Sequence, residues 1–266
     1  KYGENQYERI FSVMDIWLGK IFKKLDMKNT LIVITADHGT DIGVYNSKME
    51  ESNKVFQRIR KRNSGVGFKI GQKIAHKFPK SMLPVRKKLA EKYTSKVDEE
   101  IKERIKPEIE KIENSELRPY EKRLMKYSIF PITDLYDDKY VVPIIFSGHN
   151  VPTKKMITQQ VQSVDIFPTI AGIIGMNTSN YGKRGRDLMP IIKNENFDEV
   201  PAYIETATNS IKTQSNNTIG IRTSEYKYFR DRNEKTKNVH LYDLKNDPLE
   251  EYNISEKNHD LVKKME

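Results

Sequence analysis

The sequence predicts an α/β protein with a mostly parallel sheet flanked by helices, a basic helical insertion and a small carboxyl-terminal antiparallel subdomain. Short, continuous apolar runs rich in β-branched residues occur at Thr30–Thr35 and Tyr140–Ser147. Such runs are typical of strands that are buried on both faces of a parallel sheet. A helical pattern precedes the first run, and another follows the second. Beyond Val200, short alternating runs separated by turn residues predict the antiparallel sheet.

The first predicted element is an amphipathic helix. From Tyr7 to Leu25, apolar residues recur three and four positions apart, and charged residues occupy the other faces. Residues Asp26–Asn29 end the helix, and the strand Thr30–Thr35 follows. The tetrapeptide Ala36–Gly39 comes directly at the carboxyl end of that strand, where open α/β sheets bind their ligands. This tetrapeptide is therefore the first candidate for a functional site.

A charged segment separates the two predicted core strands. Residues 49–126 contain no comparable strand pattern, so we interpret them as a helical insertion into a core made of residues 1–48 and 127–200. Residues 201–266 are assigned to the antiparallel subdomain. The whole chain has a net charge of +10, yet residues 48–126 alone hold 23 basic and 12 acidic side chains. The basic character is therefore local to the insertion.

The elements after the insertion follow from the same patterns. Pro143 lies near the start of the second core strand, where a missing backbone donor is tolerated. The period of Gln159–Met176 is helical, with Ser163 or Asp165 as the N-cap and Pro168 in the first turn. The subdomain is expected to hold four strands and a final helix, at Ala202–Glu205, Thr218–Arg222, Tyr226–Arg230, Val239–Tyr242 and Leu261–Glu266.

Composition excludes several classes of protein. The chain contains no uninterrupted apolar run of about 18 residues, so no segment is expected to span a bilayer as a helix. It has no cysteine, which excludes a disulfide framework, a zinc–thiolate site and a cysteine nucleophile within these residues. The chain begins at Lys1 and runs directly into a helical pattern, so we expect it to be part of a longer protein, and its compartment is left open.

Asp37 and His38 are the candidate metal ligands. At the end of a strand the chain no longer forces neighbouring side chains to opposite faces, so a carboxylate and an imidazole can turn toward one cation. Gly39, which follows, permits a tight turn. The structural alternative is that Asp37 caps a turn and that His38 is a hydrogen-bonded core histidine.

Four stretches give this pair a context. They are Tyr7–Gly39, which ends NTLIVITADHG; Leu135–Gly148, LYDDKYVVPIIFSG; Gln160–Ile170, QVQSVDIFPTI, leading to GRDL at Gly185–Leu188; and Ile221–Tyr228, IRTSEYKY, followed by LYDLKNDPLEEYN at Leu241–Asn253. In content, order and spacing they resemble the sulfatases of the alkaline phosphatase superfamily. The resemblance covers nearly all of the chain except the insertion, and it implies an alkaline-phosphatase-like fold.

The resemblance also implies a cofactor and a nucleophile. Asp37 and His38 would be the second pair of ligands of the catalytic divalent cation, usually Ca²⁺ in sulfatases. In the family, the first pair of metal-binding carboxylates and the nucleophile precede the segment that starts here. The nucleophile is a formylglycine made from cysteine or serine, or a threonine or serine in the phosphatase relatives. The residues at hand should therefore bind metal weakly and hydrolyse nothing by themselves.

One expected side chain is missing. Sulfatases usually place a lysine or histidine, which contacts the sulfate or phosphate of the substrate, shortly before the motif that begins here at Leu135. Residues 130–134 contain no cation. The role could pass to Lys48, which we prefer, to Lys126 or to a residue of the insertion. The alternative for Lys48 is a solvated lysine at the start of a helix.

The most basic part of the insertion is residues 53–93, with thirteen lysines and arginines and one acidic residue. Three interpretations compete: a solvated helical lid whose apolar side packs on the domain, a surface that binds anionic lipid headgroups, and a surface that captures a sulfated or phosphorylated substrate. No nucleic-acid partner is expected, because the sequence holds no stacking-aromatic module or recognised DNA-binding motif.

The sequence as a whole therefore predicts a metal-dependent sulfuric ester hydrolase that acts on a sulfated small molecule or glycan. One alternative is a phosphatase, phosphodiesterase or phosphoethanolamine transferase of the same superfamily, with a phosphorylated substrate and with Zn²⁺ or Mn²⁺, which accept a histidine ligand readily. The other is a catalytically degenerate lipid- or glycan-binding protein.

Overall fold

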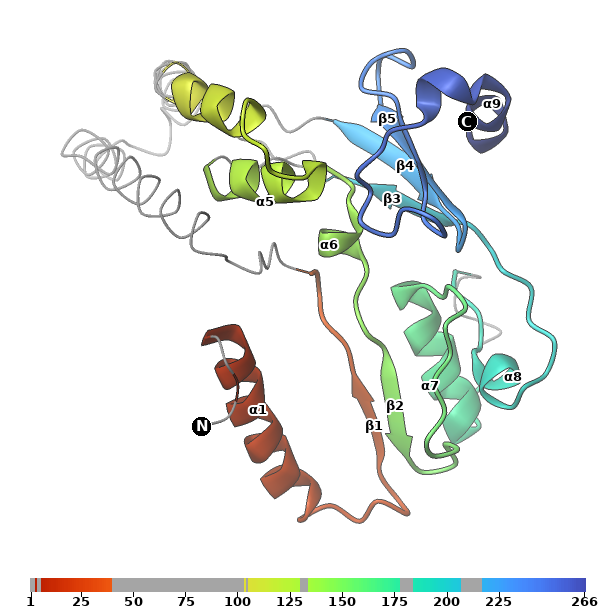
Figure 1. Ribbon diagram of the computed structural model, residues 1–266. Helices are drawn as coiled ribbons and strands as arrows, with labels where there is room; N and C mark the ends of the chain where they lie inside the picture. The colour runs from red at the N-terminus through yellow and green to blue at the C-terminus, as the bar shows by residue number, and fades with distance from the viewer. Residues whose placement is uncertain are drawn as a thin grey trace, which may run out of the picture. The chain divides into compact units, whose positions relative to one another are not determined.

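The computed structural model describes residues 3, 6–39, 103, 105–129, 134–177, 184–206 and 217–266, and Figure 1 shows its elements. The chain divides into two compact units. Unit 1 comprises Lys1–Asp37 and Val142–Val200, and unit 2 comprises His38–Val141 and Pro201–Glu266. Residues 40–102, which include Lys48 and the basic residues 53–93, lie outside the described residues, so the helical insertion expected there stays a prediction.

Unit 1 begins with helix α1 (Gln6–Phe22) and strand β1 (Leu31–Ile34), where the sequence predicts a helix and a strand. The apolar stripe of α1 is largely exposed; Trp17, for example, is 60% exposed. Unit 1 continues with β2 (Ile145–Gly148), the 3₁₀ turn η2 (Ser163–Asp165), α7 (Ile166–Ile174) and α8 (Met189–Ile192). None of the described helices combines the length and the apolar character that a membrane crossing requires.

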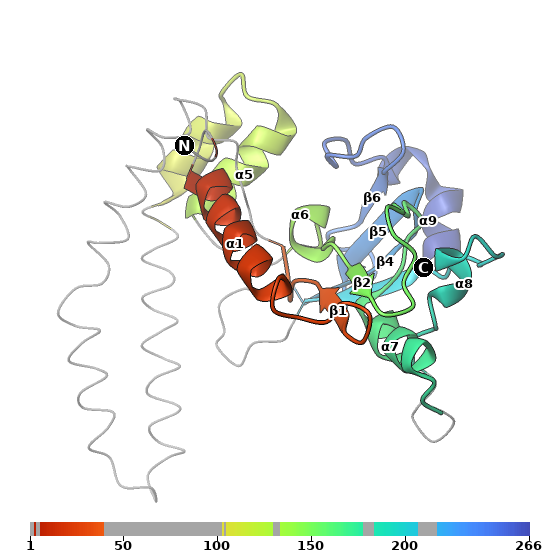
Figure 2. The same cartoon turned by 90° about the horizontal axis from the view of Figure 1, so that it is seen from below.

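The two strands of unit 1 pair antiparallel. Leu31 lies opposite Gly148, and Ile34 lies opposite Ile145. Figure 2 shows the two strands side by side, seen from below. Both sheets of the described residues are antiparallel, so the mostly parallel sheet is not confirmed. The physical reason is that a continuous apolar run reports apolar surroundings on both faces of a strand and carries no information about the direction of its neighbour.

The second core strand is also shorter than expected. It begins at Ile145 and not at Tyr140, because residues Asp137–Tyr140 form a helical turn, α6, and Pro143 supplies no backbone donor to a ladder. Residues 141–144 between them are irregular. This difference matters for the site, because α6 takes up part of the motif that follows Leu135.

A buried carboxylate organises the helical part of unit 1. Asp165 is 1% exposed and accepts hydrogen bonds from the backbone N–H groups of Gln162 and Arg186, each at 2.8 Å. The Thr169 hydroxyl donates to the Asp165 carbonyl and accepts from the N–H of Leu188. Asp165 thus closes a capping box with Gln162. The regular helix therefore begins later than the predicted Gln159.

Unit 2 contains the predicted antiparallel sheet, with its strands in the order β3-β4-β5-β6. The strands are β3 (Ala202–Glu205), β4 (Thr218–Arg222), β5 (Tyr226–Asp231) and β6 (His240–Asp243). Each lies within one residue of its predicted bounds, so the antiparallel sheet is confirmed. A 3₁₀ turn, η3 (Ser255–Lys257), and helix α9 (His259–Met265) end the chain.

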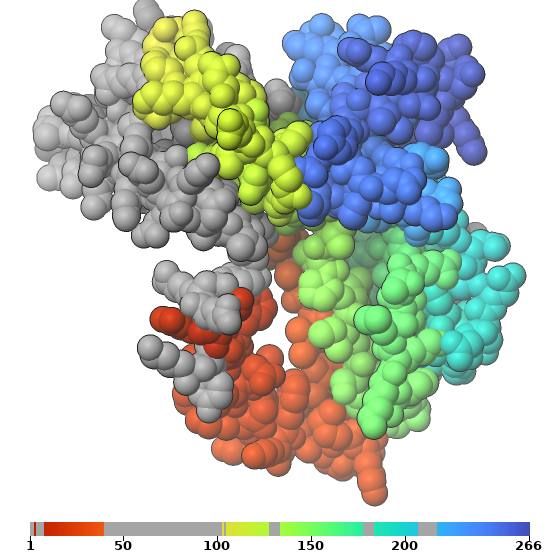
Figure 3. Space-filling model, in the orientation of Figure 1, coloured from red at the N-terminus to blue at the C-terminus, as the bar shows by residue number. Residues whose placement is uncertain are grey.

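Helical residues preceding α6 supply the other side of the core of unit 2. Residues 105–113 are helical, and helix α5 (Pro119–Ile129) follows. Ile112 and Leu124 pack in one cluster with Leu135, which is fully buried, and with Phe229 of β5. In Figure 3 the yellow-green surface of these helices adjoins the blue surface of the carboxyl-terminal residues. This cluster supports α6 from its amino-terminal side.

Candidate functional site

The candidate metal ligands follow β1 after two intervening residues, Thr35 and Ala36. Asp37 ends the first segment of unit 1, and His38 begins unit 2. Both side chains are exposed, so the alternative of a buried core histidine is wrong for His38. Among the described residues, no group of three or more His, Asp and Glu side chains is arranged to hold a metal ion. The assignment of Asp37 and His38 as ligands therefore stays a prediction.

The imidazole of His38 makes a hydrogen bond within the turn. Its Nδ1 lies 2.6 Å from the carbonyl oxygen of Gly39. Because a carbonyl oxygen only accepts, Nδ1 carries the proton and donates it. In the neutral ring the lone pair is then on Nε2. Histidine ligands of metals commonly show this arrangement, since one ring N–H donates to a carbonyl or a carboxylate and the other nitrogen binds the metal.

Gly39 is held against helix α6. Its N–H donates to the carbonyl oxygen of Lys139 at 2.8 Å. A Cβ atom at Gly39 would lie 2.0 Å from the carbonyl oxygen of Asp138, which is closer than any side chain can approach. The residue at this position must therefore be glycine because of a close backbone approach, in addition to the tight turn expected from the sequence.

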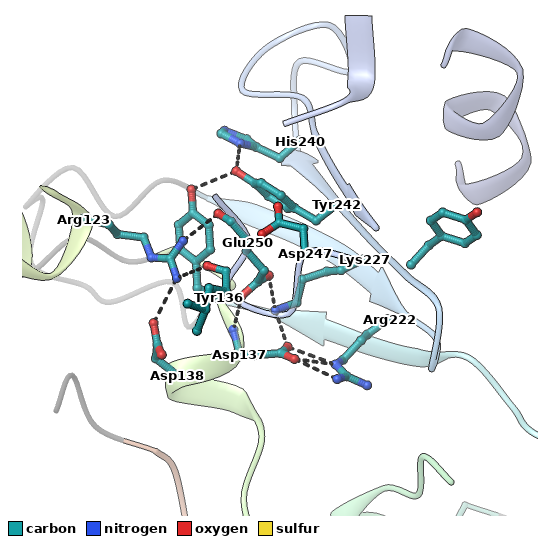
Figure 4. A network of polar contacts seen from close by, with 12 residues as sticks. Arg123, Tyr136, Asp137, Asp138, Arg222, Lys227, His240, Tyr242, Asp247 and Glu250 are labelled. Atoms are coloured by element: carbon teal, nitrogen blue, oxygen red, sulfur yellow. Dashed lines mark hydrogen bonds and ion pairs between the residues drawn. The ribbon is translucent and has the colours of Figure 1, made fainter. Parts of the chain in front are cut away.

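A network of ion pairs holds α6 on the sheet of unit 2 (Figure 4). The carboxylate of Asp137 accepts from Nε and Nη2 of Arg222, the latter at 2.7 Å, and from Nζ of Lys227 at 2.5 Å. Lys227 also donates to Glu250 at 2.8 Å. The second oxygen of Glu250 accepts from the backbone N–H of Asp137 at 2.8 Å. Glu250 thus caps the amino terminus of α6.

The neighbouring carboxylate of α6, Asp138, has its own partners. It accepts from Nη2 of Arg123 at 3.2 Å and from the hydroxyl of Tyr120 at 3.3 Å. Arg123 also donates to the carbonyl oxygens of Leu249 and Glu250 and lies over the ring of Tyr136, 3.8 Å from its centroid. Helix α5, α6 and the segment around Glu250 are therefore joined by one guanidinium group.

Burial and charge act in opposite directions in this network. Burial alone would raise the pKa of Asp137, but hydrogen bonds from Arg222 and the charge of Lys227 hold that pKa below its ordinary value. For Glu250, burial is the largest influence and Asp137 adds repulsion, so its pKa is raised in spite of Lys227. Lys227 is 0% exposed. Its ammonium group therefore neutralises carboxylates that could not otherwise remain charged inside the protein.

An aromatic cluster lies next to these ion pairs. The hydroxyl groups of Tyr136 and Tyr242 are 3.1 Å apart, and Nδ1 of His240 lies 3.0 Å from the Tyr242 hydroxyl. The His240 ring stacks on Phe229 at a centroid distance of 4.5 Å. Burial lowers the pKa of His240 to about 4, so this partly buried histidine is neutral at pH 7 and packs on Phe229.

Sequence reasoning missed the network around Lys227. A lysine and an arginine in predicted strands are ordinarily exposed or edge cations, but Lys227 is fully buried and Arg222 is paired with Asp137. One signal was present in the sequence. Acidic pairs occur at residues 137–138 and 250–251, both within motifs quoted for the resemblance. The strand pattern identified Lys227 as part of a strand but did not show which face it occupies.

Only some of the lysines that could contact the sulfate or phosphate of the substrate lie within the described residues. Lys48 lies outside the described residues, so its role stays a prediction. Lys126 forms an ion pair with Glu113, which gives it a structural partner. Lys139 of α6 lies over the ring of Tyr127, 3.8 Å from its centroid. Asp243 and Asp247 accept backbone hydrogen bonds in turns.

Comparison with known proteins gives two family matches. The model of the family described as "Sulfatase" matches residues 4–176, and the model described as "N-sulphoglucosamine sulphohydrolase, C-terminal" matches residues 120–266. No curated protein sequence matches the chain.

Several solved structures are similar to part of the chain. One is a protein in complex with its substrate D-glucosamine-2-N,6-O-disulfate, with 20% identity, a TM-score of 0.43, and 53% of this chain and 30% of that chain covered. Another is a 2-O GAG sulfatase, with 24% identity, a TM-score of 0.40, and 49% and 29% covered. A third is the phosphonate monoester hydrolase of Agrobacterium radiobacter, with 18% identity, a TM-score of 0.41, and 53% and 31% covered.

The chain spans less than a third of the length of these solved proteins. The two family models overlap in residues 120–176 and together reach from residue 4 to residue 266. The Sulfatase model alone matches well over half of the 266 residues and includes both Asp37 and His38. The chain therefore belongs to the sulfatase family.

Proposed function

We propose that this chain supplies part of the metal site of a sulfuric ester hydrolase, with Asp37 and His38 as two ligands of a divalent cation. The observation that carries the proposal is the DHG turn itself. It follows β1 after Thr35 and Ala36, the side chains of Asp37 and His38 are both exposed, and the Sulfatase match includes it. The hydrogen bond from His38 Nδ1 to Gly39 leaves the lone pair of the neutral ring on Nε2, the nitrogen that a metal would take.

The donor set fits a cation that accepts both oxygen and imidazole nitrogen. We propose Ca²⁺ first, as in the family, and Zn²⁺ or Mn²⁺ as alternatives, because imidazole suits transition metals better than calcium. A bound cation of this kind would stabilise negative charge on the sulfate oxygens. The contribution of this chain is to hold that cation through Asp37 and to fix the tautomer of His38 through Gly39.

Further ligands and the nucleophile would come from outside the described residues. A calcium ion takes six to eight oxygen ligands, and two side chains cannot supply them. The chain has no cysteine, so a formylglycine made from cysteine would also lie outside it. We therefore expect weak metal binding by these 266 residues and activity only in a longer protein.

The substrate that we propose is a sulfated sugar. The support is the match of residues 120–266 to a model named for N-sulphoglucosamine sulphohydrolase. Within that region lie α6, its ion-pair network and the antiparallel sheet. A sulfated glucosamine is therefore the first substrate to test.

Metal binding tests the first part of the proposal. In an NMR titration of the chain with Mn²⁺, the imidazole signals of His38 should broaden before those of His149. The Nδ1 of His149 donates to the Lys28 carbonyl oxygen, and its Nε2 accepts from the Asn150 side-chain amide. Asp37→Asn should raise the Mn²⁺ concentration needed, and Ca²⁺ should compete. Equal broadening of His38 and His149 would contradict the proposal.

Activity tests the second part. A longer protein that contains this chain should hydrolyse aryl sulfates faster than aryl phosphates, and Asp37→Ala should abolish that activity. Faster hydrolysis of phosphates would favour the phosphatase alternative. Inactivity on both esters, together with retained binding of sulfated glucosamine, would favour a degenerate glycan-binding protein.

A further inference from the structure

Helix α6 is held in place in an unusual way for so short an element. None of its four residues, Asp137–Tyr140, is buried, so burial of its own side chains does not fix it. It is attached instead through charged groups: Asp137 to Arg222 and Lys227, and Asp138 to Arg123. The carboxylate of Glu250 receives the backbone N–H at its amino terminus.

The partners of α6 belong to rigid parts of unit 2. Lys227 is on β5, which is paired on both sides, and Arg222 is on β4. Their charged groups meet Asp137 where little solvent reaches: the Lys227 side chain is 0% exposed and those of Arg222 and Asp137 are about one fifth exposed. Removal of one buried partner is costly because it leaves the other charge uncompensated. The position of α6 is thus coupled to the sheet.

The other side of α6 faces the DHG turn. The Gly39 N–H donates to Lys139, and the Gly39 Cα approaches the Asp138 carbonyl so closely that no side chain fits between them. This is contact of backbone with backbone, which transmits a displacement more directly than contact of flexible side chains. A shift of α6 therefore displaces Gly39 and, through the bond from His38 Nδ1, the imidazole ring.

We infer that α6 and the ion pairs of Asp137 and Asp138 form a positioning device for the metal-binding turn. Asp137, Asp138 and Lys227 act through α6 on Gly39 and His38 and touch neither metal nor substrate. The inference rests on the proposed function only in taking His38 as a metal ligand. It adds that the antiparallel subdomain, through Lys227 and Arg222, determines the geometry of the site.

The test compares two carboxylate-to-amide changes in unit 2. Asp137→Asn keeps the shape of the side chain, removes its charge and leaves Lys227 paired with Glu250. The matched control is Glu266→Gln, which removes a carboxylate that contacts Arg230, Lys235 and Tyr228, none of them in α6. Asp138→Asn is a second variant in case Asp137→Asn does not fold.

The first readout is amide hydrogen exchange of Gly39, measured by NMR on the whole chain without metal and normalised to the amides of β5. Asp137→Asn should accelerate Gly39 exchange at least tenfold relative to β5. Glu266→Gln should leave that ratio within about twofold of the wild-type value. A purely structural role would accelerate both sets of amides together, and an unchanged ratio in both α6 variants would overturn the inference.

The second readout is the Mn²⁺ concentration that broadens the His38 signals. It should rise at least fivefold in Asp137→Asn and stay unchanged in Glu266→Gln. The two ideas can fail separately. If Mn²⁺ does not act on His38 of the wild-type chain, the proposed function fails while Gly39 exchange still tests the coupling. If Mn²⁺ binding depends on Asp37 but Gly39 ignores the α6 variants, only the positioning inference fails.

Discussion

The buried lysine of β5 gives the sharpest stability prediction. In Lys227→Met, the aliphatic part of the side chain is retained and the ammonium group is lost. Among the described residues, Glu250, whose side chain is 1% exposed, then loses its only ion-pair partner, and Asp137 keeps only Arg222. Breaking a buried ion pair by removing one partner costs about 3–5 kcal/mol, because an uncompensated charge stays buried. We expect a loss of that size at pH 7, measured by urea denaturation of the chain.

The same variant has a pH signature with a definite sign. Without Lys227, the pKa of Glu250 rises further above its value in the unfolded chain, so the folded state binds more protons than the unfolded state. Stability then increases as the pH falls through the raised pKa. The deficit of Lys227→Met relative to the wild type should therefore shrink between pH 7 and pH 5.

A double variant separates charge from packing. Lys227→Met with Glu250→Gln removes the ammonium group and the carboxylate that depends on it, so it should recover at least half of the lost stability at pH 7. A loss below about 1 kcal/mol in the single variant would refute the reasoning. So would a double variant that is the sum of its single variants, because it would show that the two groups do not interact.

Three further predictions concern other parts of the described chain. Gly39→Ala should destabilise the contact with α6 by about 1–3 kcal/mol, because its Cβ meets the Asp138 carbonyl at 2.0 Å. Gly19→Ala, in helix α1, where a Cβ meets nothing within 4 Å, controls for the loss of a glycine in denaturation experiments. Asp165→Ala should lower the free energy of unfolding by about 2–4 kcal/mol, because two backbone N–H groups lose a buried acceptor. Asp260→Ala, at an exposed position of α9, should lower it by less than about 0.5 kcal/mol. Equal losses in the two variants would contradict this prediction. Burial lowers the pKa of His240 to about 4, so the free energy of unfolding should fall by up to about 3 kcal/mol as the pH drops from 6.5 toward 4. His240→Phe should flatten that part of the curve of stability against pH. An unchanged slope in the variant would show that His240 does not titrate with unfolding.

The pattern of the sequence determined the local elements of this protein. The strands β3 to β6 follow from runs of alternating residues between turn residues, and α1 follows from its apolar period, because both signals depend only on neighbours along the chain. The resemblance that places Asp37 and His38 shortly after β1 also follows from sequence motifs alone, and the Sulfatase match confirms the family. Their role as ligands stays a prediction.

Only the tertiary structure decided how these elements meet. The direction of β2 relative to β1, the helical turn within the motif after Leu135, and the burial of Lys227 all depend on groups distant in sequence. Lys227 is separated by 90 residues from Asp137 and by 23 from Glu250, and a strand pattern does not show which charges lie across from a side chain. A buried charge is stable only when its partners arrive from elsewhere in the fold, so its position cannot be deduced from its own neighbours.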